Sequence, residues 1–157
     1  MTTNKRQMEV VNGNLFDAFL DENVIIVHGC NAQGVMGSGV ARYVRDNFPK
    51  AFYDYVRVFE EQQGLTLGQV VMTEVLPRRI IANAITQQYY GSDGKRYVDY
   101  DAVRESFRKV HDFAIGNNYH NVAFPKIGAG LGGGDWRVIE KIIKEELKDL
   151  NYVLYVV

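Results

Sequence analysis

The stretch IVHGCNAQGVMGSGVA, residues 26–41, holds the side chains of this chain that are best suited to chemistry. His28 follows an apolar run, and an imidazole near neutrality can exchange a proton or attack phosphorus directly. Asn31 follows closely, and its amide can orient a sugar hydroxyl or a water molecule. We therefore expect His28 and Asn31 to be catalytic. The alternatives are a histidine hydrogen-bonded in the wall of a sheet and an asparagine that only shapes a turn.

Glycines form the second pattern, since nine of the 15 lie in two short stretches. The first stretch holds Gly29, Gly34, Gly37 and Gly39, and the second, PKIGAGLGGGDW, holds Gly128, Gly130, Gly132, Gly133 and Gly134. Each stretch links an apolar run to a helical one, where backbone N–H groups carry the partial positive charge of a helix N-terminus. Glycine also lets a ligand approach the backbone closely. The spacing predicts two anion-binding loops at one edge of a sheet, with two irregular turns as the alternative.

The elements that must position these loops alternate between valine- and isoleucine-rich runs and segments of helical period, a pattern typical of an α/β domain. We expect six strands in one sheet, over residues 8–13, 23–29, 68–75, 79–86, 121–125 and 152–157. Only a tight hairpin fits between the third and fourth strands, so the sheet should be mixed.

Helical spacing of apolar residues predicts helices over residues 40–48, 52–59, 103–114 and 136–150, with a short helix over LFDAFL, residues 15–20. Pro49 and Gly116 should end the first and third helices, and Asp135 should cap the last. The polar and aromatic segment 87–100 fits no element. It is either an exposed connection or a wall over a site.

Length, charge and cysteine content limit the kinds of protein that this chain can be. All 157 residues fit one domain, residues 1–157, and a net charge of -1 gives no broad surface for nucleic acid. Cys30 is the only cysteine, which excludes an internal disulfide, and we expect it to be a buried small residue. The N-terminal MTTNKRQMEVV lacks an apolar run of signal-peptide length, and no stretch approaches a membrane span. These observations predict a cytoplasmic protein without a metal or cofactor, and we expect it to be a monomer.

Three motifs in order resemble the macro domain family: VNGNLFD, then HGCNAQGVMGSGVA, then FPKIGAGLGGGDW before a final VLYVV. The resemblance covers nearly the whole chain. It implies a three-layer α/β/α fold around a six-stranded mixed sheet, with ADP-ribose as the ligand. Within the family, the chain is similar to the branch of ADP-ribose 1''-phosphate phosphatases and terminal ADP-ribose glycohydrolases.

The resemblance also implies where the ligand lies. Asn14 and Leu15 would contact the adenine, unless Asn14 only caps the short helix, and Tyr155 and Val157 would border it. The first loop would line the distal ribose and diphosphate through Gly34, Val35, Met36, Gly37, Ser38, Gly39 and Val40. The second would hold the diphosphate from the other side through Gly128, Ala129, Gly130, Leu131 and Gly132.

Two departures from the family pattern decide the expected activity. Where glycohydrolase members have a lysine and an aspartate, this chain has Gln87 or Gln88 and Gly132. The resemblance therefore implies removal of the terminal phosphate from ADP-ribose 1''-phosphate, with His28 as nucleophile or general base. The alternatives are a module that binds ADP-ribose or a related nucleotide signal without turnover, and an ADP-ribosyl hydrolase acting on modified macromolecules.

Overall fold

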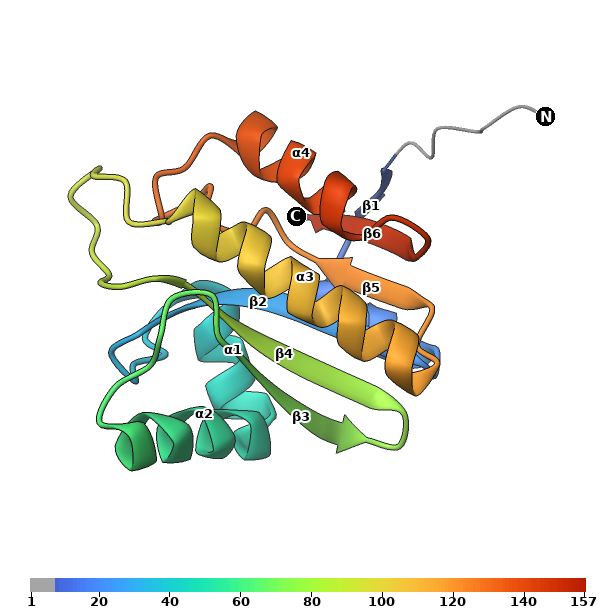
Figure 1. The fold of residues 1–157 in the computed structure, drawn as a ribbon, viewed down its shortest axis with the longest axis horizontal. Coiled ribbons are helices and arrows are strands. Elements are labelled where there is room, and N and C mark those ends of the chain that lie inside the picture. The colour runs from blue at the N-terminus through green and yellow to red at the C-terminus, as the bar shows by residue number, and fades with distance from the viewer. Residues whose placement is uncertain (1–7) are drawn as a thin grey trace.

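A six-stranded sheet forms the centre of the computed structural model, which describes residues 8–157 (Figure 1). The strands are β1 (Glu9–Asn12), β2 (Val24–Asn31), β3 (Val70–Leu76), β4 (Arg79–Gln87), β5 (Asn121–Phe124) and β6 (Asn151–Val156). Their order is β1-β6-β5-β2-β4-β3, with parallel pairing throughout except between β3 and β4. The predicted mixed sheet is confirmed. The expectation about a signal peptide falls largely on residues 1–7, outside the described residues.

Helices cover both faces of the sheet (Figure 1). They are the 3-10 helix η1 (Leu15–Leu20), α1 (Gly39–Asn47), α2 (Pro49–Gln62), α3 (Tyr100–Asn117) and α4 (Trp136–Glu146). The core on one face packs α3 and α4 against the strands, and the core on the other packs η1, α1 and α2. The three-layer arrangement is therefore confirmed. None of the helices formed by residues 8–157 combines the length and the apolar character that a membrane span requires.

Two predicted helix ends were wrong. Helix α3 continues through Gly116 to Asn117, because Asn118 takes the left-handed cap position at a φ of 61°. Helix α4 ends at Glu146 instead of continuing to Leu150, although Leu150 remains buried. The predicted cap is confirmed, since the Asp135 side chain accepts a hydrogen bond from the backbone N–H of Arg137.

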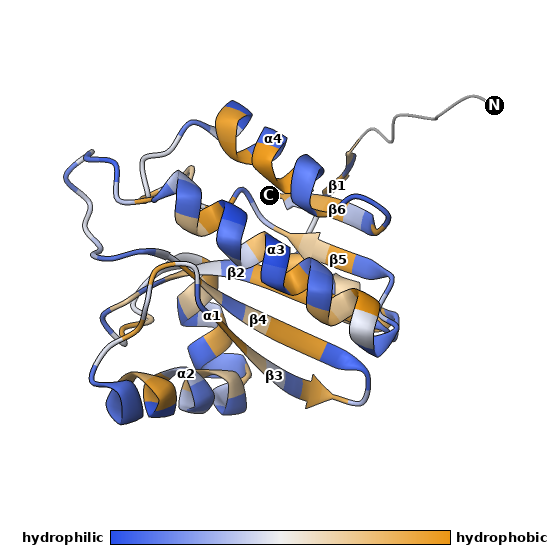
Figure 2. Cartoon of the chain, viewed as in Figure 1, coloured by the Kyte–Doolittle hydropathy of each residue, from blue (hydrophilic) through white to orange (hydrophobic). Residues whose placement is uncertain are grey.

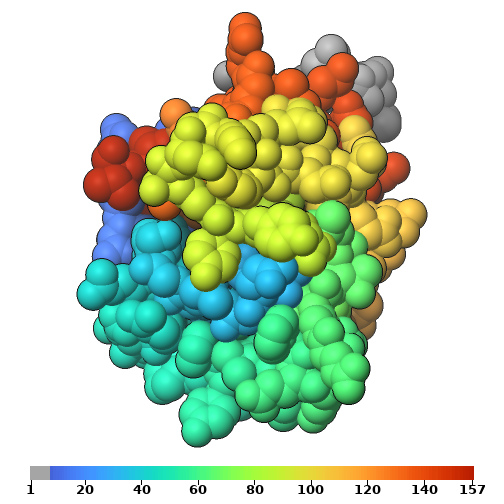
Figure 3. Space-filling view, turned by 90° about the vertical axis from the view of Figure 1, so that its left-hand side faces the viewer, coloured from blue at the N-terminus to red at the C-terminus, as the bar shows by residue number. Residues whose placement is uncertain are grey.

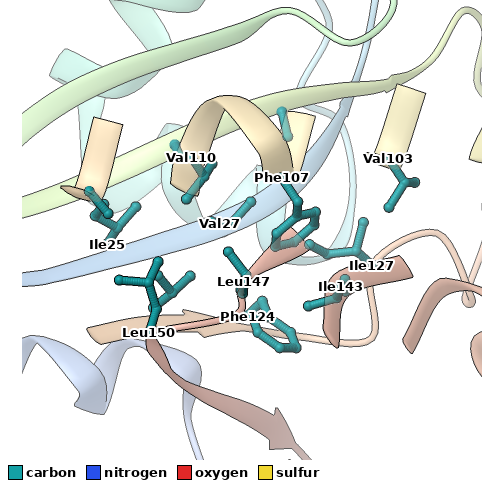
Figure 4. Packing of buried hydrophobic residues seen from close by; sticks show 14 of the residues in the cluster. Ile25, Val27, Val103, Phe107, Val110, Phe124, Ile127, Ile143, Leu147 and Leu150 are labelled. Atoms are coloured by element: carbon teal, nitrogen blue, oxygen red, sulfur yellow. The ribbon is translucent and has the colours of Figure 1, made fainter. Parts of the chain in front are cut away.

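Successive side chains of β2 point to opposite faces of the sheet, so this strand contributes to the core on each face. Ile25 and Val27 pack toward α3 and α4, with Phe107 and Leu147 among their partners (Figure 4). Ile26 belongs to the cluster on the opposite face. The helices turn hydrophobic stripes toward the sheet and hydrophilic residues outward (Figure 2). Side chains at even positions of β2 therefore point toward the layer of α1 and α2.

The carboxyl ends of β2, β4 and β5 lie at the same edge of the sheet because these strands are parallel neighbours. The segments that follow them, residues 32–38, 88–99 and 125–135, meet at that edge, on the left of Figure 1. Open α/β sheets bind ligands outside this edge. The topology thus brings both glycine-rich stretches to one place.

Candidate functional site

A cavity of about 590 Å³ lies between the segments that follow β2, β4 and β5. This volume is in the range of small-molecule sites. The predicted ligand-binding residues that line it are Val35, Gly37, Ser38, Gly39, Val40, Gly128, Gly130, Leu131 and Gly132. The structure therefore brings the two glycine loops together around one cavity, and their contact with a ligand stays a prediction.

The first turn of α1 presents backbone amides to this cavity. The N-cap residue Ser38 makes no capping hydrogen bond through its side chain, and the turn contains no acidic residue. Gly39, Val40 and Ala41 line the cavity, and amides in the first turn of a helix have no acceptor within the helix. They carry the partial positive charge of the helix end. This wall therefore suits an anionic group such as a phosphate.

The second glycine loop supplies further backbone amides to the cavity lining. The N–H groups of Gly130, Leu131 and Gly132 donate to no backbone carbonyl within residues 8–157. Lys126 lines the cavity too, whereas its described lining contains no aspartate or glutamate. Positive partial charges thus face the cavity from two sides without a neighbouring carboxylate that would repel a phosphate.

The glycines of the two loops have two different physical explanations. A Cβ atom added at Gly39 or Gly130 would meet no atom within 4 Å, so the backbone at these positions borders open space. A Cβ at Gly128 or Gly134 would instead lie 2.5 Å from a methyl carbon of Val98. Close approach of a ligand can explain Gly130, whereas at Gly39 the φ of 58° also favours glycine. The second pair is required by the packing of the chain itself.

The segment 88–99, whose role the sequence left open, forms the third wall of the cavity. Tyr90, Gly91 and Ser92 line the cavity. The amides of Tyr97 and Val98 donate to the carbonyl of Gly132 at 2.7 and 3.0 Å, which ties this segment to the second glycine loop. Figure 3 shows the segment in yellow-green against the blue residues after β2. Its position is that of a wall over the site.

His28 lies inside β2, because pairing with β4 continues two residues beyond the predicted strand end at Gly29, to Asn31. Its side chain is only 1% exposed, and Nε2 lies 2.5 Å from Oδ1 of Asn83. Burial lowers the pKa of His28 to about 4, against the opposing effect of the Asn83 hydrogen bond. The structure therefore gives His28 the surroundings of the alternative interpretation, a neutral histidine bonded within the sheet. His28 nevertheless lines the cavity, and because Nε2 is bonded to Asn83, any direct role in chemistry would fall to Nδ1.

The amide of Asn31 is occupied by its own loop. Its Oδ1 accepts from the backbone N–H of Gln33 at 2.9 Å, and its Nδ2 donates to the carbonyl of Val35 at 2.7 Å. The hydroxyl of Tyr55 also lies 3.0 Å from Oδ1. These bonds match the alternative in which Asn31 shapes the turn, and they fix the start of the first glycine loop.

Cys30 is buried, as predicted. Its Sγ lies 3.8 Å from Nδ1 of His28, within the same apolar layer. Burial raises the pKa of the Cys30 thiol far above its ordinary value, so the reactive thiolate is not formed near neutral pH. A role as nucleophile finds no support in this environment.

The residues assigned to the adenine lie at the ends of β1 and β6, outside the lining of the cavity. Oδ1 of Asn14 accepts from the amide of Phe16 at 2.9 Å and caps η1, which was its alternative role. Leu15 is buried in the core, Tyr155 is half-buried and Val157 is exposed. Adenine binding by this group stays a prediction.

Three further predicted residues do not line the cavity. Met36 is 1% exposed and belongs to the core beside α1 and α2. Gly34 has a φ of 77°, and a Cβ there would lie 3.0 Å from the ring of Phe59. Ala129 is half-buried in the second loop. Met36 and Gly34 thus support the first loop from behind.

The Macro domain family model matches residues 27–143. The chain belongs to the macro domain family. An ADP-ribose 1''-phosphate phosphatase from Candida albicans is 25% identical over 96% of this chain and 99% of its own. A DNA ADP-ribosyl glycohydrolase from Thermus aquaticus is 26% identical over 93% of this chain, which spans 39% of that protein. A crystal structure of a protein from Bacteroides thetaiotaomicron is similar at 30% identity and a TM-score of 0.85, covering 95% of this chain and 99% of the other.

Several residues that line the cavity of this macro domain were not among the predicted site residues, and Thr86 is one of them. Thr86 ends the buried run of β4 and lines the cavity. Threonine is common in strands, so its type and position did not distinguish it from a residue of the sheet.

Within residues 8–157, no group of three or more His, Cys, Asp or Glu side chains is arranged to hold a metal ion.

Proposed function

We propose that this macro domain binds ADP-ribose 1''-phosphate and hydrolyses its terminal phosphate. The observation that carries the proposal is the cavity itself, which has amide-rich walls on two sides and no lining carboxylate. The similarity to a phosphatase named for this substrate, over 99% of that enzyme's length, supports the choice of ligand.

Binding depends on the diphosphate. Its oxygens accept hydrogen bonds from the first turn of α1 on one side and from the loop of Gly130 and Leu131 on the other. The segment 88–99 closes the third side and reduces contact with water. The ligand is therefore held mainly by backbone groups, whose positions are set by the fold.

In the hydrolytic step, water attacks the phosphorus, the bond from phosphorus to the oxygen on C1'' breaks, and ADP-ribose and inorganic phosphate are released. Charge on the phosphoryl oxygens is stabilised by fixed N–H donors and by the ammonium of Lys126. His28 and Asn31 act as positioning residues in this proposal. His28 fixes β2 against β4 through Asn83, and Asn31 fixes the first loop.

The test measures phosphate release from ADP-ribose 1''-phosphate by the wild type and by His28→Gln, which keeps a side-chain N–H donor for Asn83. We expect release by the wild type and retention of at least about a tenth of that rate by the variant, because the ring does not form a bond to phosphorus. Absence of release by the wild type would contradict the proposed activity. Complete loss of phosphate release in a folded His28→Gln protein would show that His28 acts as nucleophile or general base.

A second function, binding of ADP-ribose without turnover, is favoured by one observation. His28, Cys30 and Asn31 line the cavity, but the imidazole and the thiol are buried and the amide of Asn31 is bonded to its own loop. Calorimetry that detects ADP-ribose binding by a protein that releases no phosphate from the 1''-phosphate would select this function.

A further inference from the structure

Thr86 carries a buried hydroxyl at the cavity for which the described protein offers no partner. We infer that Oγ1 of Thr86 donates a hydrogen bond to an oxygen of the bound ligand, which makes Thr86 a positioning residue of the site. This inference rests on the proposed function, because it assumes an oxygen-rich ligand in the cavity.

The first observation is the hydroxyl itself. Thr86 is 0% exposed and lines the cavity. Oγ1 has no hydrogen-bond partner within residues 8–157. Buried polar atoms are nearly always hydrogen-bonded, because an unpaired one keeps the cost of its lost hydration. A buried donor beside a cavity is therefore suited to a partner that enters the cavity.

The second observation is an irregularity in the sheet at this residue. Along the pair of β2 and β4, Cys30 lies opposite Ile85 and Asn31 lies opposite Gln87, so Thr86 has no opposing residue. Such bulges change the direction of a side chain and occur often beside active sites. The carbonyl oxygen of Thr86 accepts a hydrogen bond of 2.8 Å from the backbone N–H of Asp99, which fixes the backbone at Thr86.

The third observation is the glycine beside the hydroxyl. A Cβ atom added at Gly29 would lie 2.8 Å from Oγ1 of Thr86 and 3.1 Å from a methyl carbon of Ile127. Any larger residue at position 29 would press against the hydroxyl. Gly29 also lines the cavity, so the space next to Oγ1 is kept free of side chains at the point where the two glycine loops meet.

The acceptor that fits this position is an oxygen of a phosphate or of a ribose hydroxyl. Both lie along ADP-ribose, and both accept a hydrogen bond from a threonine hydroxyl. ADP shares the diphosphate and lacks the distal ribose. A comparison of the two ligands therefore shows whether the acceptor belongs to the ADP part or to the distal ribose.

Thr86→Val tests the inference because it removes the hydroxyl and keeps the branched shape. We expect about a tenfold weaker binding of ADP-ribose, equivalent to about 1.4 kcal/mol, by calorimetry. Thr86→Ser, which retains the hydroxyl, should bind within about twofold of the wild type. If Thr86→Val weakens ADP binding equally, the acceptor belongs to the ADP part of the ligand, and if ADP binding is unchanged, it belongs to the distal ribose.

The matched control is Ser106→Ala. Ser106 is also 0% exposed and its hydroxyl also has no partner within residues 8–157, but it lies in α3 and not in the cavity lining. Neither Ser106→Ala nor Thr86→Val should lower the melting temperature, and Ser106→Ala should leave affinity unchanged. Wild-type affinity in Thr86→Val, or a lowered melting temperature, overturns this inference alone. Failure of the wild type to bind either ligand overturns the proposed function with it.

Discussion

Nε2 of His28 and Oδ1 of Asn83 lie 2.5 Å apart across the pair of β2 and β4. Nδ2 of Asn83 donates to the carbonyl of Ala51 in α2 at 3.0 Å, so the atom that faces His28 is the amide oxygen, an acceptor. His28 must then be the donor, which places the proton of the neutral ring on Nε2. One imidazole and one amide thereby join two strands and a helix beneath the site.

This pairing predicts how stability depends on pH. Burial lowers the pKa of His28 to about 4 from an ordinary value of 6.5. Between these values the unfolded chain binds more protons than the folded one, so stability falls as pH decreases through this window. We expect His28 to account for a loss of about 3 kcal/mol by pH 4.

Urea unfolding of the wild type and of His28→Gln at pH 7 and pH 4.5 measures this loss. The decrease between the two pH values should be about 2 to 3 kcal/mol smaller in the variant, which has no imidazole to titrate. Parallel decreases in the two proteins would show that the ring is accessible to protons in the folded state.

Asn31→Ala should lower both stability and affinity. The substitution leaves the amide of Gln33 and the carbonyl of Val35 without their side-chain partner, at a cost of about 1 to 3 kcal/mol. The first glycine loop then loses its fixed shape, and ADP-ribose should bind more weakly. Thermal unfolding and calorimetry measure the two effects. A lower turnover number at unchanged stability and affinity would instead indicate a chemical role.

Gly130→Ala distinguishes an effect on ligand binding from an effect on the stability of the fold. A Cβ at Gly130 meets no atom of the protein within 4 Å, so the variant should keep the melting temperature of the wild type. The added methyl group lies beside amides proposed to bind the diphosphate, and we expect at least about a tenfold weaker binding of ADP-ribose.

The control for this substitution is Gly116→Ala, at an exposed position within α3 where a Cβ also meets no atom within 4 Å. It should raise stability by about 0.5 to 1 kcal/mol through helix propensity and leave binding unchanged. Equal affinities of Gly130→Ala and the wild type would place the ligand away from the second loop.

Cys30 offers a test of the burial beneath the site. Burial raises the pKa of its thiol, and the sequence contains no other cysteine. Alkylation by iodoacetamide at pH 8 should be about a hundredfold slower in the native protein than in urea, because it requires local opening. Rapid labelling of the native protein would show that this side of the sheet opens readily.

The elements of this fold could be predicted from local pattern, because valine-rich runs and helical spacing are properties of short windows. All six strands appear within about two residues of their expected bounds. The end of α3 could not be predicted, since Gly116 is tolerated within a helix and Asn118 provides the left-handed cap.

The site was predicted less completely for a different reason. Its glycine loops follow from composition, whereas the partner of His28 is Asn83, 55 residues away in the chain. Sequence spacing does not reveal such a contact. The same holds for Gly128 and Gly134, which must be glycine because Val98 lies against them. The unpartnered hydroxyl of Thr86 is likewise a property of the packing within residues 8–157 and has no local signal in the sequence.

Trp136 opens α4 immediately after the second glycine loop and is the sole tryptophan among 157 residues. Its indole packs partly against the core, next to the cap residue Asp135. Selective excitation would separate its fluorescence from that of the 10 tyrosines. The molecule therefore contains an intrinsic optical probe beside the proposed diphosphate site, and titrations could be followed by emission without attaching a dye.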